Sequence, residues 1–378
     1  MPLNYERIAT MLKKFSVSNF RGFAEKLTWN LANPGNYGFN TFAVKDGLVK
    51  NGIIYGKNGS GKSNLGLAVF DIVNHISHKM KKGDYYDSFA YAGAVNKPVS
   101  FWYEFKFGET TVEYSYSKVK GGRLIEERLA VDGRQVFALK SKTSFEIDTK
   151  QFPIEKGLID NLKDNANNVS IVNFLITSFP LAEEHYLLKL QRFVENMLWF
   201  RCLEEREFIG FESGVTLIEQ YIIKKNLIDD FASFVKTVSG QEFQFVNPSP
   251  SPDMLFCQIG SEQVVFQNIA STGTRSLQLF YLWLKKTFDK ASFVFIDEFD
   301  AFYHFELSYG VCQNLFKMPC QAFVTTHNTY LMTNDLLRPD CNFYLKNNKI
   351  TPLCDLTDKE LRQANNIEKL YRGGSFES

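Results

Sequence analysis

Hydrophobic and polar residues alternate along residues 99–136, with the period of two that a strand with one buried face requires. Residues 106–109 and 132–133 interrupt the alternation with turn-forming residues, among them Gly108 and Gly133. We therefore predict an antiparallel meander in this part of the chain. Its inward-facing side chains are expected to be Phe101, Tyr103, Phe105, Phe107, Val112, Tyr114, Tyr116, Leu129 and Val131.

Shorter apolar runs precede the meander and predict strands at residues 15–17, 41–44 and 53–55. After Ser63 the apolar spacing becomes helical, and the predicted helix ends near residues 79–83, where lysines gather. These lysines could touch a nucleic-acid backbone. Cations also complement the dipole at a helix C-terminus, however, and that second explanation is the more common one.

Residues 155–240 show helical spacing, and no heptad pattern among them lasts beyond a few turns, so we expect short helices rather than a long coiled coil. One predicted helix presents an apolar face made of Leu187, Leu190, Val194 and Met197.

Strands and helices alternate after a loop with alternating prolines at residues 248–252. Strands are predicted at residues 255–259, 293–296 and 322–324, and a helix is predicted to begin near Thr274. Such alternation is typical of an α/β fold in which helices cover both faces of a mostly parallel sheet. We expect three parts: an N-terminal lobe with the antiparallel meander (1–150), a helical insertion (151–245) and a C-terminal lobe (246–378).

Residues 56–63, Gly-Lys-Asn-Gly-Ser-Gly-Lys-Ser, fit the phosphate-binding loop pattern G-x-x-x-x-G-K-S. The octapeptide follows an apolar run and opens a helical one, which is the context that a phosphate loop requires and an ordinary glycine-rich turn does not. In such a loop backbone N–H groups surround phosphate oxygens, Lys62 reaches the β- and γ-phosphates, and Ser63 offers its hydroxyl to Mg²⁺. The predicted nucleotide-binding residues are Gly56, Asn58, Gly59, Ser60, Gly61, Lys62, Ser63 and Asn64.

Two carboxylates, Asp297 and Glu298, end the apolar strand at residues 293–296. Buried carboxylates are unfavourable without a cationic partner, and Mg²⁺ bound with ATP is the obvious candidate. We predict that Asp297 holds Mg²⁺ and that Glu298 acts as the base that polarises the attacking water. Carboxylates at this position can also simply cap the next helix.

His327 lies in a polar segment that directly follows the predicted strand at residues 322–324. Because ligands collect at the carboxyl ends of parallel strands, His327 should share an edge with Asp297 and Ser63 and could donate to the γ-phosphate. A single histidine is more often an ordinary polar residue. Residues 271–274, Ser-Thr-Gly-Thr, precede an apolar helix and form a potential anion site, although a plain helix cap is the commoner meaning.

The composition limits the possible partners. Lys and Arg together number 43 against 42 Asp and Glu, so any nucleic-acid contact must be local. No apolar run approaches the roughly 20 residues that span a bilayer, and no signal-peptide core is visible, so we expect a soluble cytoplasmic protein without membrane contact. The cysteines form no C-x-x-C pair and are expected to be reduced thiols: Cys202, Cys257, Cys312, Cys320, Cys341 and Cys354.

At these motifs the chain resembles the ATP-binding-cassette (ABC) ATPases of the SMC, RecF and OLD type. It most closely resembles the AAA15-type ATPases of bacterial anti-phage systems, such as RloA-like and AriA-like proteins. The resemblance implies an ABC ATPase head with a mostly parallel sheet flanked by helices, an antiparallel β subdomain and a short helical insertion. It covers nearly the whole chain through residues 15–23, 56–63, 99–105, 124–129, 271–274, 297–298, His304, 326–327 and 368–374.

The resemblance also implies roles for individual residues. Ser271, Gly273 and Thr274 would form the signature that completes the ATP site of a facing subunit, Asp300 would lie near the D-loop, and His327 would be the switch histidine. ATP and Mg²⁺ are the implied cofactors, and an ATP-dependent homodimer or a higher assembly is the implied state. Two departures stand out: no Q-loop glutamine lies between the first helix and the meander, and the helical insertion is short beside the coiled coils of SMC-like relatives.

OLD-type nucleases carry a Toprim domain after the ATPase, whereas the residues that follow His327 here include acidic residues but too few apolar strands for a second sheet. We therefore expect an ATPase that regulates or holds an effector, a nuclease or toxin from a neighbouring gene, in an anti-phage defence system. The alternatives are a RecF-like or SMC-like DNA-binding ATPase in DNA repair, and a scaffold that binds ATP only to assemble.

Overall fold

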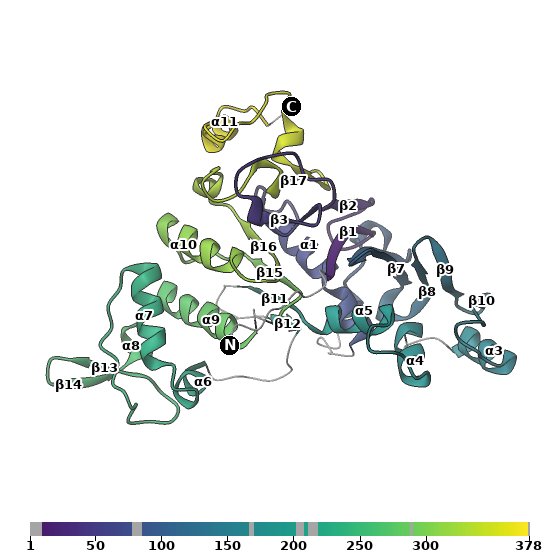
Figure 1. The fold of residues 1–378 in the computed structure, drawn as a ribbon, viewed down its shortest axis with the longest axis horizontal. Helices are drawn as coiled ribbons and strands as arrows, with labels where there is room; N and C mark the ends of the chain where they lie inside the picture. The colour runs from purple at the N-terminus through teal and green to yellow at the C-terminus, as the bar shows by residue number, and fades with distance from the viewer. Residues whose placement is uncertain are drawn as a thin grey trace.

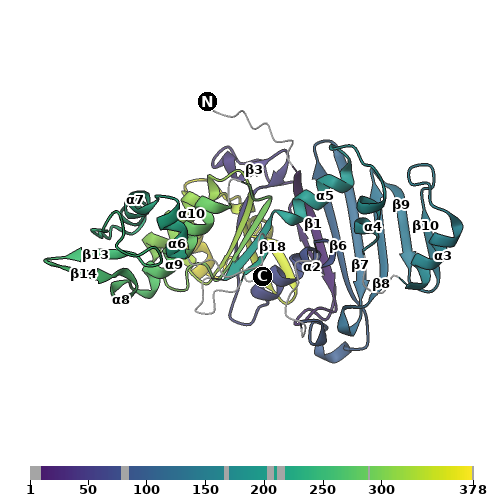
Figure 2. The ribbon, with the colours of Figure 1, turned by 90° about the horizontal axis from the view of Figure 1, so that it is seen from below.

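Two seven-stranded sheets organise the part of the chain that the computed structural model describes, residues 10–77, 85–165, 170–201, 208–210, 218–287 and 290–376 (Figures 1 and 2). One sheet is antiparallel and the other is mostly parallel. The lysines near residues 79–83 and Cys202 lie outside the described residues.

The antiparallel sheet contains the predicted meander, with strand order β10-β9-β8-β7-β6-β1-β2. Along β6 every second side chain is buried, so the alternation seen in the sequence is confirmed as one packed and one solvated face. The hairpin turns also lie where they were predicted, after Phe107 and after Val131. The strands are β1 (Thr10–Ser18), β2 (Leu27–Asn30), β6 (Val99–Phe107), β7 (Thr110–Lys118), β8 (Leu124–Val131), β9 (Arg134–Lys140) and β10 (Ser144–Ile147).

The second sheet has the order β12-β11-β15-β16-β5-β17-β18. Its five inner strands run parallel and its two edge strands pair antiparallel, which confirms the predicted α/β class. Its strands are β5 (Asn51–Tyr55), β11 (Met197–Arg201), β12 (Phe208–Gly210), β15 (Phe293–Asp297), β16 (Gln321–Thr326), β17 (Asn342–Lys346) and β18 (Lys349–Pro352). Two short hairpins, β3 (Val44–Lys45) with β4 (Leu48–Val49) and β13 (Phe256–Ile259) with β14 (Glu262–Val265), stand apart.

Helices cover both faces of the parallel sheet (Figures 1 and 2). On one side lie α6 (Ile218–Lys224), α7 (Ile228–Ser239), α9 (Thr272–Lys286) and α10 (Phe305–Phe316). On the other side α1 (Lys62–Val69) and α2 (Asp71–Ile76) lie between the two sheets, where the Tyr103 hydroxyl of β6 donates to Ala68 O at 3.2 Å. The remaining helices are α3 (Lys156–Asn165), α4 (Ile171–Ser178), α5 (Tyr186–Glu195), α8 (Phe266–Ile269) and α11 (Ile367–Arg372).

Two local predictions are wrong. Residues 155–240 are not wholly helical, because α5 ends at Glu195 and Met197 begins β11, which pairs parallel with β15. Met197, Leu198, Trp199 and Phe200 are all buried, and a short strand buried on both faces shows the same unbroken apolar run as a helix segment. Residues 41–44 form a 3₁₀ turn (Thr41–Ala43) that leads into β3 rather than a strand.

The five described cysteines are free thiols, and four of them are buried. Within the described ranges, no helix combines the length and apolarity needed to cross a bilayer. The division of the chain at residues 150 and 245 stays a prediction.

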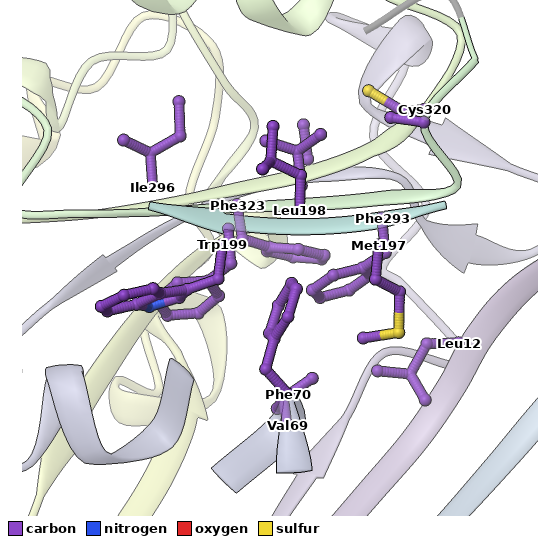
Figure 3. Packing of buried hydrophobic residues seen from close by; sticks show 14 of the residues in the cluster. Leu12, Val69, Phe70, Met197, Leu198, Trp199, Phe293, Ile296, Cys320 and Phe323 are labelled. Atoms are coloured by element: carbon purple, nitrogen blue, oxygen red, sulfur yellow. The ribbon is translucent and has the colours of Figure 1, made fainter. Parts of the chain in front are cut away.

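Aromatic side chains join the two sheets. Trp29 of β2 is fully buried, and its ring meets the edges or faces of Phe293, Phe295, Phe323 and Phe343 at centroid distances of 4.6–6.5 Å. Figure 3 shows Phe70, just after α1, pointing at Phe293 and Phe323 on the same side of the parallel sheet. The aromatic richness of the chain therefore serves a packed interior that holds the two sheets together.

We expect Trp29→Ala to lower the free energy of unfolding by about 3–5 kcal/mol, because it deletes a fully buried indole and its edge-to-face contacts. Urea denaturation followed by far-UV circular dichroism would measure the loss. Trp102→Ala is the control, since Trp102 lies on the other, half-exposed side of the antiparallel sheet and should lose clearly less. Equal losses in the two variants would contradict this role of Trp29.

Candidate functional site

The candidate site lies where β5, β16 and β15 end side by side. These strands are neighbours in parallel register, so the segments that follow them meet at one edge of the sheet. The phosphate loop follows β5, Asp297 closes β15, and His327 follows β16. The sequence-predicted groups are thus brought together by strand order.

The phosphate loop has a shape that depends on its glycines. Gly59 and Gly61 have φ of 76° and 100°, in the left-handed region that glycine adopts without strain. A Cβ on Gly56 would lie 2.5 Å from Ser60 Oγ, and one on Gly61 would lie 2.8 Å from the Phe23 ring. The Ser60 hydroxyl is buried and finds no hydrogen-bond partner among the described residues. A tight loop with an unsatisfied buried hydroxyl suits an anionic ligand with many acceptor oxygens.

Lys62 opens α1 and reaches across the loop. Its ammonium donates to Gly56 O at 2.9 Å and lies 2.9 Å from His327 Nε2. An ammonium can only donate, so Nε2 must accept, which makes the imidazole neutral with its proton on Nδ1. Partial burial, and then the Lys62 charge, lower the pKa of His327, although the ring remains exposed at the cleft.

Asp297 is fully buried at the end of β15, and both of its carboxylate oxygens have partners. Oδ2 accepts from Arg201 Nε at 3.0 Å and Nη2 at 2.9 Å, and Oδ1 accepts from the Thr325 hydroxyl at 2.8 Å. Arg201 ends β11, directly opposite Asp297 in the strand register. The buried carboxylate therefore has a counter-ion within its own chain.

Glu298 is half-buried and has φ of 48°, an uncommon value for a residue with a side chain. With Asn58, Asp300 and His327 it lines a cleft of about 490 Å³. Hollows of about 540 Å³ also lie over the outer face of the antiparallel sheet, lined by Ser100 and Ser117, but Glu298 and His327 do not line them. The cleft lined by Glu298 and His327 is therefore the candidate site.

The donor set at this edge fits Mg²⁺. Mg²⁺ favours oxygen ligands and is usually held by one or two protein groups together with water and substrate phosphates. The Ser63 hydroxyl in the first turn of α1 and the Asp297 carboxylate supply such oxygens. Oδ1 of Asp297 accepts only from Thr325 among the hydrogen bonds described above, so it keeps a lone pair for a metal ion.

The Ser271–Thr274 segment lies elsewhere. Ser271 is exposed and caps the N-terminus of α9, accepting from the Thr274 N–H at 3.1 Å, so the predicted helix start is confirmed. None of Ser271, Gly273 and Thr274 lines the cleft. Gly273 instead packs against Phe302, where an added Cβ would lie 2.8 Å from the carbonyl oxygen, in the segment that follows Glu298.

Sequence reasoning missed Arg201 and Thr325. Arg201 ends the apolar run 197–200 much as Asp297 ends 293–296, and this shared pattern was the available signal. Thr325 immediately precedes the Thr326-His327 pair but carries no signal of its own, since buried strand threonines are common.

A family model described as "AAA domain, putative AbiEii toxin, Type IV TA system" matches residues 53–333. The chain belongs to this family. It is therefore a nucleotide-binding domain of the ATPase type, in agreement with the phosphate loop and the carboxylates at its edge. A search of curated proteins finds no sequence with a significant match.

Among solved structures, the chain is distantly similar to heads of SMC proteins. A "SmcHead bound to the C-winged helix domain of ScpA" is 14% identical with a TM-score of 0.45, and 90% of this chain and 96% of that one are covered. An SMC head from Thermotoga maritima is 13% identical with a TM-score of 0.41, covering 90% and 98%. An Smc head domain with an extended coiled coil, bound to the C-terminal domain of ScpA and derived from Pyrococcus furiosus, is 14% identical with a TM-score of 0.44, and 90% of this chain and 95% of that one are covered.

We expect the pKa of His327 to lie below the ordinary histidine value of 6.5. We expect Lys62→Met to raise the pKa of His327 part of the way toward that value. The substitution removes the neighbouring positive charge but leaves most of the burial. Histidine ring signals followed by NMR across pH 4–8, and assigned with His327→Gln, would measure both values. A pKa that Lys62→Met leaves unchanged or lowers would contradict the Lys62–His327 contact.

Proposed function

We propose that this chain binds and hydrolyses ATP with Mg²⁺, closes on a second copy around the bound nucleotide, and thereby regulates an effector in an anti-phage defence system. The observation that carries the proposal is the meeting of Lys62, Glu298 and His327 at one edge of the parallel sheet. Lys62 supplies a cation that can bind phosphate, Glu298 a carboxylate that can orient water, and His327 a neutral imidazole.

Each residue of the site would have a separate role in phosphoryl transfer. The N–H groups of the phosphate loop and the Lys62 ammonium bind the β- and γ-phosphates. Ser63 and Asp297 would hold Mg²⁺, which neutralises charge that develops on the phosphate oxygens. Glu298, at the cleft, orients water and accepts its proton, while His327 Nδ1–H is available to donate.

Dimerisation around ATP would complete the site from outside. Ser271 and Thr272 are exposed at the start of the 15-residue helix α9, where the positive end of the helix dipole favours an anion. Because Ser271, Gly273 and Thr274 do not line the cleft of their own chain, a facing copy is the natural source of the phosphate that they would bind. Gly273 contacts the segment that follows Glu298, so closure and hydrolysis would be mechanically linked.

The role in defence draws its support from the family description, which names a putative toxin of a type IV toxin–antitoxin system. An ATPase from such a two-gene module would hold or trigger a nuclease or toxin from the neighbouring gene. We place the chain in the AAA15-type branch on its sequence motifs. A DNA-repair role remains the alternative, and near-zero net charge gives it little support.

We expect Glu298→Gln to reduce ATP turnover by about 10²-fold or more while nucleotide affinity is kept, because the base is lost and the phosphate loop is intact. Trapped ATP should then hold a dimer, detectable by light scattering after size exclusion. Adding Ser271→Arg to Glu298→Gln should return the monomer. Glu262→Gln on the exposed β14 is the matched control and should behave as wild type. Ordinary turnover in Glu298→Gln would overturn the catalytic assignment.

We expect the chain, expressed in bacteria with its neighbouring gene, to reduce phage plating, and Lys62→Ala to abolish the protection because nucleotide binding is lost. Plating efficiency against a phage panel is the measurement. Protection by Lys62→Ala equal to wild type would reject control by nucleotide. Duplex DNA binding with a steep salt dependence, together with no protection, would favour the repair role.

A further inference from the structure

We infer that Thr325 is a positioning residue for hydrolysis, which holds the backbone of Glu298 so that its carboxylate lies at the cleft. The inference rests on the proposed function, because it concerns the same ATP site. Its basis is one hydroxyl that is bonded to Asp297, the last residue of β15, and to Glu298, the residue after it: Thr325 Oγ1 donates to Asp297 Oδ1 and accepts from the Glu298 N–H, each at 2.8 Å.

Glu298 needs such a hold because its backbone is in the left-handed region, with φ of 48°. A residue with a Cβ adopts this conformation only when its surroundings impose it. Thr325 contributes twice, since its carbonyl oxygen also accepts from the Phe299 N–H at 3.3 Å. The turn that follows β15 is therefore held by hydrogen bonds to a single residue of β16, Thr325.

The direction of the hydroxyl is fixed by its partners. A hydroxyl has one proton, and the buried Asp297 carboxylate can only accept it, so the lone pairs of Thr325 Oγ1 face the Glu298 N–H. Donating to a carboxylate polarises the O–H bond and makes the oxygen a better acceptor. Asp297 is itself held by Arg201, so hydrogen bonds run from β11 through β15 to β16 and back to Glu298.

The same strand also places His327, two residues further on, against Lys62. The neighbouring Thr326 repeats the arrangement, because its hydroxyl donates to Asp300 Oδ2 at 2.6 Å and accepts from the Asn328 N–H at 2.8 Å. Thr325 is fully buried, so solvent cannot replace its hydroxyl if that group is removed. The end of β16 thus sets the relative positions of base and histidine.

Thr325→Val tests the inference, since valine keeps the shape and strand preference of threonine and removes only the hydroxyl. We expect kcat for ATP to fall about 10²-fold, the size associated with misplacing a catalytic group, with KM and the affinity for a fluorescent ATP analogue changed less than about threefold. Thr325→Ser keeps the hydroxyl and should recover most of kcat. Thr28→Val removes a strand hydroxyl in the other sheet, bonded to Ser16, and should leave kcat unchanged.

The Glu298→Gln background separates positioning from general damage. If Thr325 acts through Glu298, adding Thr325→Val to Glu298→Gln should lower kcat no further. A further loss of the same size, or Thr325→Val alone with wild-type kcat, would overturn the inference. If Thr325→Val does not fold, Thr325→Ala replaces it with the same expected results. Absence of hydrolysis by the wild-type chain would instead contradict the proposed function.

Discussion

The parallel register of β15, β16 and β5 is the constraint on which the site depends. Phe295 lies opposite Phe323 and Val324 lies opposite Ile53, so the three strands end level with one another. A slip of one residue would move every side chain of the shifted strand to the opposite face of the sheet and separate Lys62 from His327. Trp29 of the antiparallel sheet makes aromatic contacts with β15, β16 and β17, and these contacts help to hold the strands in register. Packing away from the cleft thereby stabilises the geometry of the cleft.

Much of this fold could be predicted because its signals are local. The phosphate loop carries its own pattern, and Ser271 caps α9 where the sequence places a helix start. The meander alternates with a clear period of two. β11 could not be predicted in this way, since a short strand buried on both faces by Met197 to Phe200 has no alternation that distinguishes it from the end of α5. Tertiary contact with β15 decides its conformation.

The site shows the same limit more sharply. Lys62, Asp297, Glu298 and His327 lie at or just beyond the carboxyl ends of strands, and this location could be predicted from pattern alone. Their partners could not, because Arg201 meets Asp297 only after β11 is known to lie beside β15. Thr325 likewise gains its meaning only from the strand order that sets β16 next to β15. The residues at the cleft therefore leave a sequence pattern, whereas the residues that hold them in place are defined by the strand order of the sheet.

The charges of the cleft are arranged in pairs before substrate is considered. Asp297 is neutralised by Arg201, and burial lowers the pKa of Lys62 while Asp297, Glu298 and Asp300 act in the opposite sense. His327 is neutral because it accepts from Lys62. A triphosphate entering this cleft would draw the Lys62 ammonium from Gly56 O and His327 Nε2 toward its own oxygens. The imidazole would then be released from Lys62 at the moment when a γ-phosphate is present, which couples the histidine to the nucleotide through a single shared hydrogen bond.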